Sequence, residues 1–250
     1  MRPHTIQVRP YSHLATCYDL LTGRAAFTHT RQRFEALVQH YGVTFRSAVD
    51  VGCGTGLFAC YLSRRWRVPV FGIDSSPEML ASAACNCPDP EVRFLLQDMR
   101  SFCLPCPVDL ATANTYTFNH LMNLDDLRRA IQSIHANLNR RGYLIFDLLS
   151  DRQPTIIRSP LRRIRLAGRK ILHQIRWDQS RNLLSIRIVH GSTGGSPFKS
   201  ETYLGRTYST LDVGRCLQDC GFMIRGIHDS HTLAPVYRGT PQVFVVAYKR

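Results

Sequence analysis

The sequence predicts an α/β fold: a doubly wound, mostly parallel sheet of seven strands that ends in an antiparallel hairpin, with an antiparallel β insertion after the fifth strand. Three observations support this prediction. Between residues 46 and 150, short apolar runs typical of buried strands alternate with segments of helical periodicity. Beyond residue 151, β-like segments follow one another with turn signals and without helices between them. One helical segment and two apolar runs then close the chain.

The first two thirds of the chain predict helices and parallel strands in alternation. Residues 12 to 42 carry apolar side chains near every 3.6 positions, which predicts helix with an interruption around Gly23. Ser76 is a candidate N-cap with Pro77 at the first helical position, and Gly142 is the expected turn before the fifth strand. The predicted strands are SAVDVG, VPVFGID, VRFLLQD, VDLATAN and GYLIFDLL, and the helices between them are GLFACYLSRR, SPEMLASAAC and LDDLRRAIQSIHANL.

The last hundred residues predict the insertion and the end of the sheet. Four β-like runs are RRIRLAG, KILHQIRWD, NLLSIRIVHG and KSETYLGRTYS. A helix over TLDVGRCLQDCG is expected to be capped by Thr210 and ended by Gly221, and FMIRGIHD and PQVFVVAYKR predict the hairpin. We therefore expect four segments: a helical segment over 1–45, a core over 46–150, the insertion over 151–209, and a completing helix and hairpin over 210–250.

Composition narrows the class of protein. No uninterrupted apolar stretch is long enough to cross a bilayer, and the N-terminus lacks the apolar segment and cleavage site of a signal peptide, so a cytoplasmic location without membrane partners is expected. The odd number of cysteines, nine, fits free thiols in a reducing compartment. Four of them could hold zinc, but one C-x-C and one C-x-x-C lack the usual pair of knuckles, so no metal is expected; they are Cys85, Cys87, Cys103 and Cys106.

Positive charge is concentrated in the insertion and the C-terminal part. Residues 151 to 250 contain 17 Lys and Arg against 6 Asp and Glu, which supplies most of the net charge of +14. Such a field attracts anionic partners such as RNA, a phosphorylated metabolite or an acidic peptide. Arginine outnumbers lysine 29 to 3, however, a bias that often reflects genome composition, so the charge alone selects none of these partners.

The glycine-rich stretch DVGCGTG, residues 50 to 56, follows the first predicted strand. A dinucleotide fingerprint needs a third glycine where Leu57 stands, and a phosphate-binding P-loop needs a lysine directly after its last glycine. Both are therefore excluded. The remaining pattern is an acid, Asp50, followed by three alternating glycines that let a ligand approach the backbone closely.

This stretch resembles motif I of the class I S-adenosylmethionine-dependent methyltransferases, D/E-x-G-x-G-x-G. The resemblance implies a Rossmann-like fold, S-adenosylmethionine as cofactor and S-adenosylhomocysteine as product. Asp74 lies where the family keeps the acid that binds the ribose hydroxyls, and Asp98 matches the acid beside the adenine amino group. The cofactor-binding residues implied are Tyr18, Asp50, Gly52, Cys53, Gly54, Gly56, Asp74, Ser75, Met79, Asp98, Met99 and Asn114.

The resemblance reaches the two segments expected to cover the site. ATCYDLLTG is similar to a Tyr-Asp segment that such enzymes place over the cofactor, which makes Tyr18 a lid residue. FKSETYLGRTYSTLDVGRCLQDCGF is similar to the segment that links their β insertion to the last helix, with Glu201, Arg206 and Tyr208 at matching places. The insertion is then a lid that selects the substrate. Ordinary strand packing is the alternative for Tyr203 and Tyr208.

The segment NTYTFNHL after the fourth strand offers the groups for proton transfer. His120 is the preferred general base and Tyr116 a second catalytic candidate, although a histidine here can equally cap the next helix. Asn119 is expected to orient the substrate or the loop, and Arg206 and Tyr208 to contact the substrate. Methyl transfer from a sulfonium is an in-line displacement that needs positioning and exclusion of water more than a catalytic triad.

The expected function is methyl transfer to a nitrogen or oxygen of a small molecule in a biosynthetic pathway, and an anionic acceptor fits the charge. An RNA or protein substrate, bound through the basic insertion, is the alternative, although NTYTFN lacks the N/D-P-P-Y/F signature of many enzymes that methylate amino groups of nucleic acids and proteins. A third reading is an enzyme that uses S-adenosylmethionine for other chemistry. The acceptor atom and the oligomeric state stay open.

Overall fold

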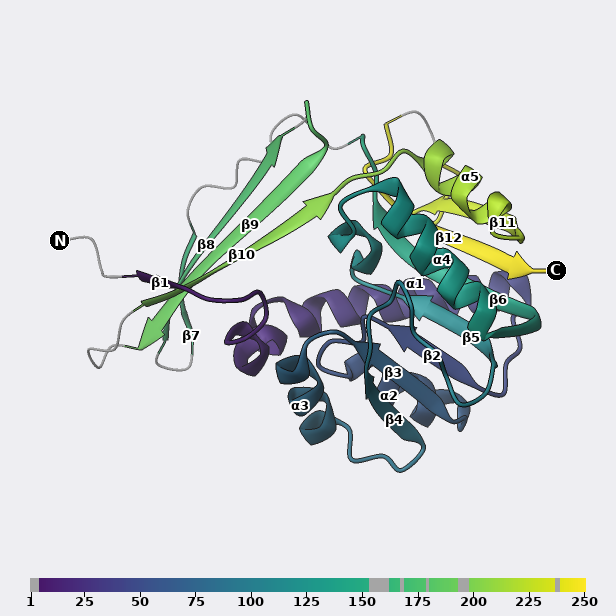
Figure 1. Cartoon of the computed structure of the whole chain (residues 1–250), viewed down its shortest axis with the longest axis horizontal. Coiled ribbons are helices and arrows are strands. Elements are labelled where there is room, and N and C mark those ends of the chain that lie inside the picture. The colour runs from purple at the N-terminus through teal and green to yellow at the C-terminus, as the bar shows by residue number, and fades with distance from the viewer. Residues whose placement is uncertain (1–4, 153–161, 167–168, 179, 193–197, 237–238) are drawn as a thin grey trace.

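The computed structural model describes residues 5–152, 162–166, 169–178, 180–192, 198–236 and 239–250, with the side chains of 162–166 and of a few further residues left out. These residues form two β-sheets: a seven-stranded sheet in the core and a five-stranded outer sheet that projects from one end of it (Figure 1). The strand order in the core sheet is β11-β12-β6-β5-β2-β3-β4. No helix in this part of the chain combines the length and the apolar character that a membrane span requires.

The core sheet confirms the predicted α/β fold. Strands β4, β3, β2, β5 and β6 are parallel, and β12 and β11 add to β6 as an antiparallel pair. The strands are β2 (Ala48–Val51), β3 (Val70–Asp74), β4 (Val92–Leu96), β5 (Val108–Ala113), β6 (Leu138–Leu149), β11 (Phe222–Asp229) and β12 (Gln242–Lys249). Because the parallel strands run the same way, their carboxyl ends meet at one edge of the sheet.

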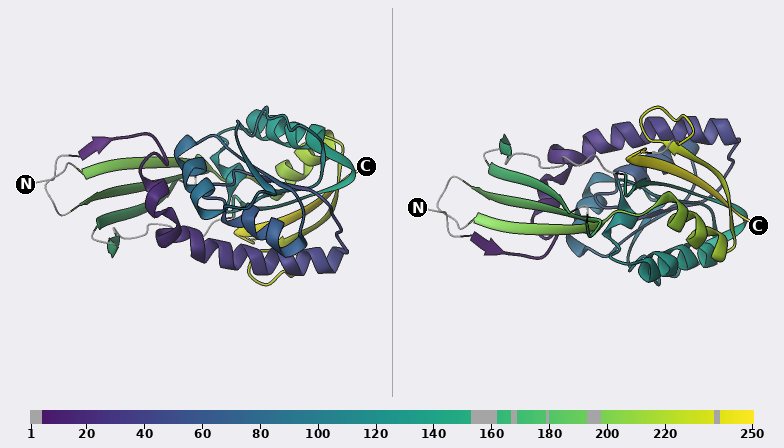
Figure 2. Two further views of the ribbon diagram at one scale, coloured as in Figure 1. Left: turned by 90° about the horizontal axis from the view of Figure 1, so that it is seen from below. Right: turned by 90° about the horizontal axis from the view of Figure 1, so that it is seen from above.

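Helices cover both faces of the core sheet, as Figure 2 shows. Phe34 and Leu37 of α1 and Leu62 of α2 are buried against one face, while Ile131 of α4 and Leu217 of α5 are buried against the other. The helices are α1 (Arg24–Tyr41), α2 (Leu57–Trp66), α3 (Pro77–Asn86), α4 (Leu124–Asn137) and α5 (Thr210–Asp219). Burial on both faces accounts for the almost wholly apolar strands of the sequence.

The outer sheet contains the predicted insertion and one strand that the sequence did not predict. Its order is β1-β10-β9-β8-β7, with β1 parallel to β10 and the other pairs antiparallel. The strands are β1 (Thr5–Gln7), β7 (Arg162–Leu166), β8 (Arg169–Asp178), β9 (Leu183–Ser192) and β10 (Phe198–Arg206). Residues Thr5–Gln7 therefore join the sheet of the insertion, whereas α1 packs on the core sheet.

Three details of the prediction are wrong. Gly23 does not interrupt the first helical region, because a 3-10 turn (Leu14–Cys17) and a π-helix (Asp19–Gly23) lead directly into α1. β6 begins at Leu138 and not after Gly142, and a shift in its pairing with β5 accommodates the bend. The N-cap of α5 is Ser209 and not Thr210.

Replacing Ser209 by Ala is expected to lower the free energy of unfolding by about 1 kcal/mol. The Ser209 hydroxyl accepts a hydrogen bond from the Asp212 backbone N–H (3.0 Å), so its loss leaves a donor of the first turn without its partner. Urea unfolding followed by circular dichroism measures the change, with Thr210→Ala as the neighbouring control. A larger loss for Thr210→Ala would return the cap to Thr210.

Candidate active site

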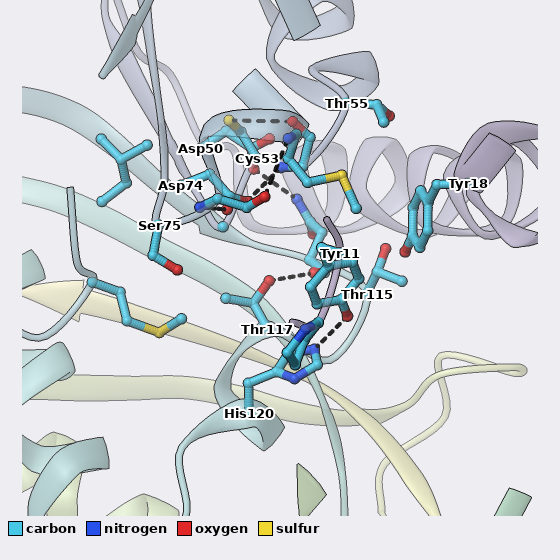
Figure 3. Close-up of a pocket in the computed structure, with 18 of the residues that line it drawn as sticks. Tyr11, Tyr18, Asp50, Cys53, Thr55, Asp74, Ser75, Thr115, Thr117 and His120 are labelled. Atoms are coloured by element: carbon cyan, nitrogen blue, oxygen red, sulfur yellow. Dashed lines mark hydrogen bonds between the residues drawn. The ribbon is translucent and has the colours of Figure 1, made fainter. Parts of the chain in front are cut away.

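A cavity of about 580 Å³ lies at the carboxyl ends of β2, β3 and β5. Its wall brings together eleven of the twelve residues expected to bind the cofactor, and His120 as well: Tyr18, Asp50, Gly52, Cys53, Gly54, Asp74, Ser75, Met79, Asp98, Met99, Asn114 and His120. Figure 3 shows the carboxylates of Asp50 and Asp74 gathered at one end and Tyr11 beside His120 at the other. These are the strand ends at which ligands bind in open α/β sheets.

The glycine loop has a different reason for glycine at each position. Gly54 has a φ of +54°, and a Cβ built on it would meet no atom within 4 Å, so its backbone borders open space at the cavity. Gly56 has a φ of +79°, and a Cβ there would lie 2.8 Å from Phe94 and 2.9 Å from Ala83. Gly56 is outside the cavity wall, so its role in the described structure is close packing of the loop on α3.

Asp74 connects the ends of β2 and β3. Its Oδ2 accepts a hydrogen bond from the Gly54 N–H (2.9 Å) and its Oδ1 accepts one from the Ser76 N–H (2.8 Å). Burial raises the pKa of this carboxyl above its ordinary value, although these backbone donors oppose the rise. The carboxylate therefore fixes the glycine loop and still borders the cavity.

Asp50 and Asn114 place buried hydrogen-bond acceptors on the cavity wall. Asp50 is 2% exposed, and its Oδ1 accepts hydrogen bonds from Thr112 Oγ1 (2.7 Å) and Asn114 Nδ2 (3.4 Å). Burial raises the pKa of Asp50 to about 7, despite these two donors. Asn114 Oδ1 is buried and has no hydrogen-bond partner among the described residues. Buried acceptors of this kind are normally paired, so this end of the cavity fits a ligand that supplies N–H donors and positive charge.

Asp98 lies at the end of β4 in an ion-pair network. The Arg100 guanidinium contacts its carboxylate at 2.6 Å and reaches Asp126 of α4 at 3.3 Å. The hydrogen bond from Arg100 holds the pKa of Asp98 below its ordinary value. The carboxylate is therefore ionised and remains a hydrogen-bond acceptor at neutral pH.

Tyr11 and His120 form the opposite end of the cavity. The Tyr11 hydroxyl lies 3.1 Å from His120 Nε2, and the Tyr11 and Tyr18 rings meet edge to face at 6.2 Å. Burial lowers the pKa of His120 below its ordinary value, and a hydrogen bond to the Leu204 backbone opposes this effect. Nε2 is the ring nitrogen that faces the Tyr11 hydroxyl, so in the neutral tautomer with its proton on Nδ1 it accepts the hydrogen bond from Tyr11. No pattern in the sequence singled out Tyr11, because its neighbours on β10 and at His120 lie far away along the chain.

The structure does not bring Tyr116 and Asn119 into the cavity wall. The Tyr116 backbone N–H donates to Asp147 Oδ1 (2.6 Å), and its φ of +62° belongs to a left-handed turn. Asn119 donates to the carbonyl groups of Leu149 (3.0 Å) and Arg206 (2.6 Å) and accepts from the Leu149 N–H (2.9 Å). All of these bonds hold the loop, the second of the two roles expected for Asn119.

Arg206 and Tyr208 likewise lie outside the cavity wall. Arg206 donates to the Met122 carbonyl (3.3 Å). Tyr208 is 3% exposed, and its hydroxyl donates to the Leu121 carbonyl (2.5 Å). For Tyr208 the structure thus matches the packing alternative, and both side chains tie the end of β10 to the loop that carries His120.

Asp147 is a buried carboxyl that the sequence analysis did not single out. It accepts hydrogen bonds from the backbone N–H groups of Thr115 (3.0 Å) and Tyr116 (2.6 Å), two consecutive residues with positive φ. Burial raises the pKa of Asp147 to about 7. An acid inside the apolar run GYLIFDLL was the available signal. It fixes the turn that precedes His120.

The cysteines and the basic insertion add little to the site. Cys85, Cys103 and Cys106 are exposed and Cys87 is buried, and the described His, Cys, Asp and Glu residues include no group of three or more arranged to hold a metal ion. The side chains of residues 153–169, which hold much of the arginine cluster, lie outside the described residues.

Comparison with known protein sequences points to one family. A model described as a methyltransferase domain matches residues 48–142. A protein of Geobacillus sp. (strain WCH70) that is named as a methyltransferase is 29% identical over 143 residues, which is 56% of this chain and 58% of that protein. The trans-aconitate 2-methyltransferase of Azoarcus sp. (strain BH72) is 42% identical over 69 residues, 27% of this chain and 26% of that protein. The matches thus span little more than half of the first relative and about a quarter of the second.

Comparison with solved structures extends the likeness to nearly the whole fold. An S-adenosylmethionine-dependent methyltransferase from Clostridium acetobutylicum ATCC 824 superposes with a TM-score of 0.79 at 20% identity, covering 96% of this chain and 98% of that one. CalS10, an amino pentose methyltransferase from Micromonospora echinaspora solved with its cofactor bound, gives 0.70 at 21% identity and covers 90% and 91%. Residues 48–142 thus match a methyltransferase domain, and the chain shares its fold with solved S-adenosylmethionine-dependent methyltransferases.

Proposed function

We propose that the protein transfers the methyl group of S-adenosylmethionine to a nitrogen or oxygen atom of a small molecule. The observation that carries this proposal is the pair of buried acceptors, Asp50 and Asn114 Oδ1, on the wall of a cavity next to the open backbone of Gly54. The ammonium group of the cofactor supplies N–H donors for Asn114 Oδ1, which has no partner among the described residues. It also places a positive charge opposite Asp50, whose two hydrogen-bond donors are neutral.

The other proposed cofactor-binding roles follow from the resemblance to the family, and the residues concerned line the same cavity. Asp74, at the end of β3, is placed to accept hydrogen bonds from the ribose hydroxyls. Asp98 is held ionised by Arg100 and is placed to accept the adenine amino group, with Met99 against the ring. Tyr18, on the N-terminal segment, lines the same cavity (Figure 3). We therefore propose residues 1–45 and 151–209 as the two parts of the lid.

The bound cofactor supplies a methyl group already activated by the positive charge of its sulfur. His120 acts on the nucleophile: its Nε2 lone pair, held toward Tyr11, accepts the proton that the attacking amine or hydroxyl loses. The new bond to the methyl carbon uses the lone pair of the nucleophile, and the electrons of the broken sulfur–carbon bond remain on sulfur. Before the nucleophile arrives, the Tyr11 hydroxyl donates a hydrogen bond to the Nε2 lone pair of His120. Tyr11 also helps to exclude water.

The cavity and the relatives both favour a small methyl acceptor. Arg9, Pro10 and Tyr11 of the N-terminal segment line the cavity. Among similar proteins, CalS10 is an amino pentose methyltransferase, KedS8 from Streptoalloteichus is a sugar N-methyltransferase, and the Azoarcus relative methylates trans-aconitate. We place the reaction in the cytoplasm, since nine cysteines without framework spacing suit a reducing compartment.

Calorimetry with S-adenosylmethionine tests the cofactor assignment. The natural chain is expected to bind, and Asp74→Ala is expected to weaken binding about 10- to 100-fold, because hydrogen bonds to a charged acceptor are lost. Asp74→Asn keeps the side-chain shape and one acceptor oxygen, so its loss should be smaller. Equal binding by the natural chain and Asp74→Ala would overturn the assignment. Cofactor with a labelled methyl group, supplied with amine and hydroxyl metabolites, then identifies the acceptor.

A further inference from the structure

Glu201 is a fully buried carboxylate in the outer sheet. It lies on β10 with 0% of its surface exposed and is outside the cavity wall. Its neighbours include a small apolar cluster that contains Leu14, Ile188 and Tyr203. A charge in such surroundings is unfavourable unless donors surround it. Four donors do so here.

The donors come from three different segments. Oε1 accepts hydrogen bonds from the backbone N–H groups of His13 and Leu14, each at 2.9 Å, and lies 3.3 Å from His190 Nε2. Oε2 accepts a short hydrogen bond from the Tyr203 hydroxyl. Burial alone would raise the pKa of Glu201, but these four donors outweigh it, and the pKa lies below its ordinary value. The carboxylate is therefore ionised when it holds the N-terminal segment.

Glu201 fulfils the role of a helix cap for the N-terminal segment. The 3-10 turn Leu14–Cys17 begins at His13, whose side chain makes no capping hydrogen bond. The first N–H groups of such a turn need an acceptor, and Glu201 supplies it from β10, 188 residues further along the chain than His13. One side chain of the insertion thus holds the start of this turn, in addition to the pairing of β1 with β10.

Three residue contacts connect Glu201 to His120. The Tyr203 hydroxyl donates to Glu201 and accepts from the Tyr11 N–H at 3.4 Å. The Tyr11 and Tyr203 rings pack with their centroids 4.4 Å apart. The Tyr11 hydroxyl in turn meets His120 Nε2 at 3.1 Å. Glu201, Tyr203, Tyr11 and His120 therefore form one continuous chain of contacts from the outer sheet to the cavity.

We propose that Glu201 is a positioning residue: by holding the backbone at His13 and Leu14 and the hydroxyl of Tyr203, it keeps Tyr11 against His120. The proposal rests on the proposed function, in which His120 Nε2 accepts the proton. Stability of the sheet alone does not call for a carboxylate here, because a well-packed apolar side chain in place of a buried ion pair is often neutral or stabilising. The charge of Glu201 is useful here because it orients its hydrogen-bond donors.

Variants of Glu201 separate positioning from packing. Glu201→Leu removes every acceptor but fills the space, whereas Glu201→Gln keeps one acceptor oxygen for His13 and Leu14. Thr202→Val is the matched control on the same strand, since successive side chains of β10 point to opposite faces. If the N-terminal segment at His13 and Leu14 is released in Glu201→Leu, chymotrypsin should cleave after Tyr11 at least about 10-fold faster. This is the factor expected for lost hydrogen bonds to a charged group.

The decisive readout is the His120 ring, followed by NMR of histidine-labelled protein without ligand. Burial lowers the pKa of His120, so exposure after loss of Tyr11 should raise it toward about 6.5 in Glu201→Leu. The His120 pKa in Glu201→Gln should lie between those of the natural chain and Glu201→Leu, and in Thr202→Val it should match that of the natural chain. With the labelled-methyl assay, Glu201→Leu should lower kcat about 10- to 100-fold, as misplaced catalytic groups do.

An unchanged His120 pKa and cleavage rate in a folded Glu201→Leu protein would overturn the proposal, even if that protein were less stable. If Glu201→Leu does not fold, Glu201→Gln decides, because it removes the charge but keeps the size of the side chain; an unchanged His120 pKa there also overturns the proposal. The NMR experiment needs no cofactor, so failure of the natural chain to bind S-adenosylmethionine is a separate result that affects only the proposed function.

Discussion

Replacing Asp50 by Asn is expected to weaken binding of S-adenosylmethionine about 100-fold and, in the same protein, to increase stability at pH 8. Affinity falls because a buried cationic group loses the charge opposite it, which typically costs 2–5 kcal/mol. Stability increases because the ionised Asp50 carboxylate is buried with only two donors, Thr112 and Asn114. Asn has nothing to ionise and removes this unfavourable charge.

The pH dependence has a defined sign. Burial raises the pKa of Asp50 from 3.8 to about 7, so the folded protein binds a proton more tightly than the unfolded chain. The free energy of unfolding therefore falls as the pH rises from about 4 to 7. This loss of stability is complete above pH 7, where Asp50 is ionised in both states. The raised pKa corresponds to roughly 4 kcal/mol at pH 8, which Asp50→Asn should largely recover.

Urea unfolding at pH 5 and pH 8 measures the stability, and calorimetry at the same two values measures affinity. In the natural chain, affinity should rise through pH 7, because a cationic ligand favours ionised Asp50; in Asp50→Asn this component should disappear. As a control, Asp109→Asn should leave the affinity unchanged, because Asp109 lies at the end of β5 away from the cavity. Unaltered affinity in Asp50→Asn would remove Asp50 from the cofactor site.

Local sequence patterns were enough to predict the core sheet. Each core strand is a short apolar run between turn residues, and each helix has its own periodicity, so neighbouring residues carry the signal. β1 could not be predicted in this way, because its three residues form a strand only by pairing with β10. The cap of α5 was misplaced by one residue because Ser209 and Thr210 both carry hydroxyls, and only backbone geometry distinguishes them.

The two ends of the cavity differ in how predictable they were. Asp50, Asp74 and Asn114 sit at successive ends of parallel strands, which topology alone brings together. The end of the cavity at His120, where the methyl acceptor is proposed to bind, depends on contacts between distant segments. Tyr116 was a catalytic candidate because it lies in NTYTFNHL, directly after the fourth strand. The left-handed turn at Thr115 and Tyr116 keeps it out of the cavity wall, and Tyr11 lies beside His120 instead.

Replacing His120 by Ala is expected to lower kcat about 100-fold, the usual contribution of a general base. The base must be neutral to accept a proton, so activity of the natural enzyme should fall as the pH drops through the pKa of His120. Because burial lowers that pKa, the acid limb should lie below about 6.5. The limb should vanish in His120→Ala, and kcat measured from pH 5 to 9 with the labelled cofactor tests this.

Tyr11→Phe distinguishes proton transfer from simple closure of the cavity. It keeps the ring beside Tyr18 and Tyr203 but removes the hydroxyl that bonds to His120 Nε2. If His120 is the base, Tyr11→Phe should retain an acid limb and lose at most about 10-fold in kcat, because only one hydrogen bond is removed. If His120→Ala retains the natural pH profile, His120 positions the acceptor and the proton leaves to solvent. An amine that binds already neutral would give that result, and its affinity would then carry the acid limb instead.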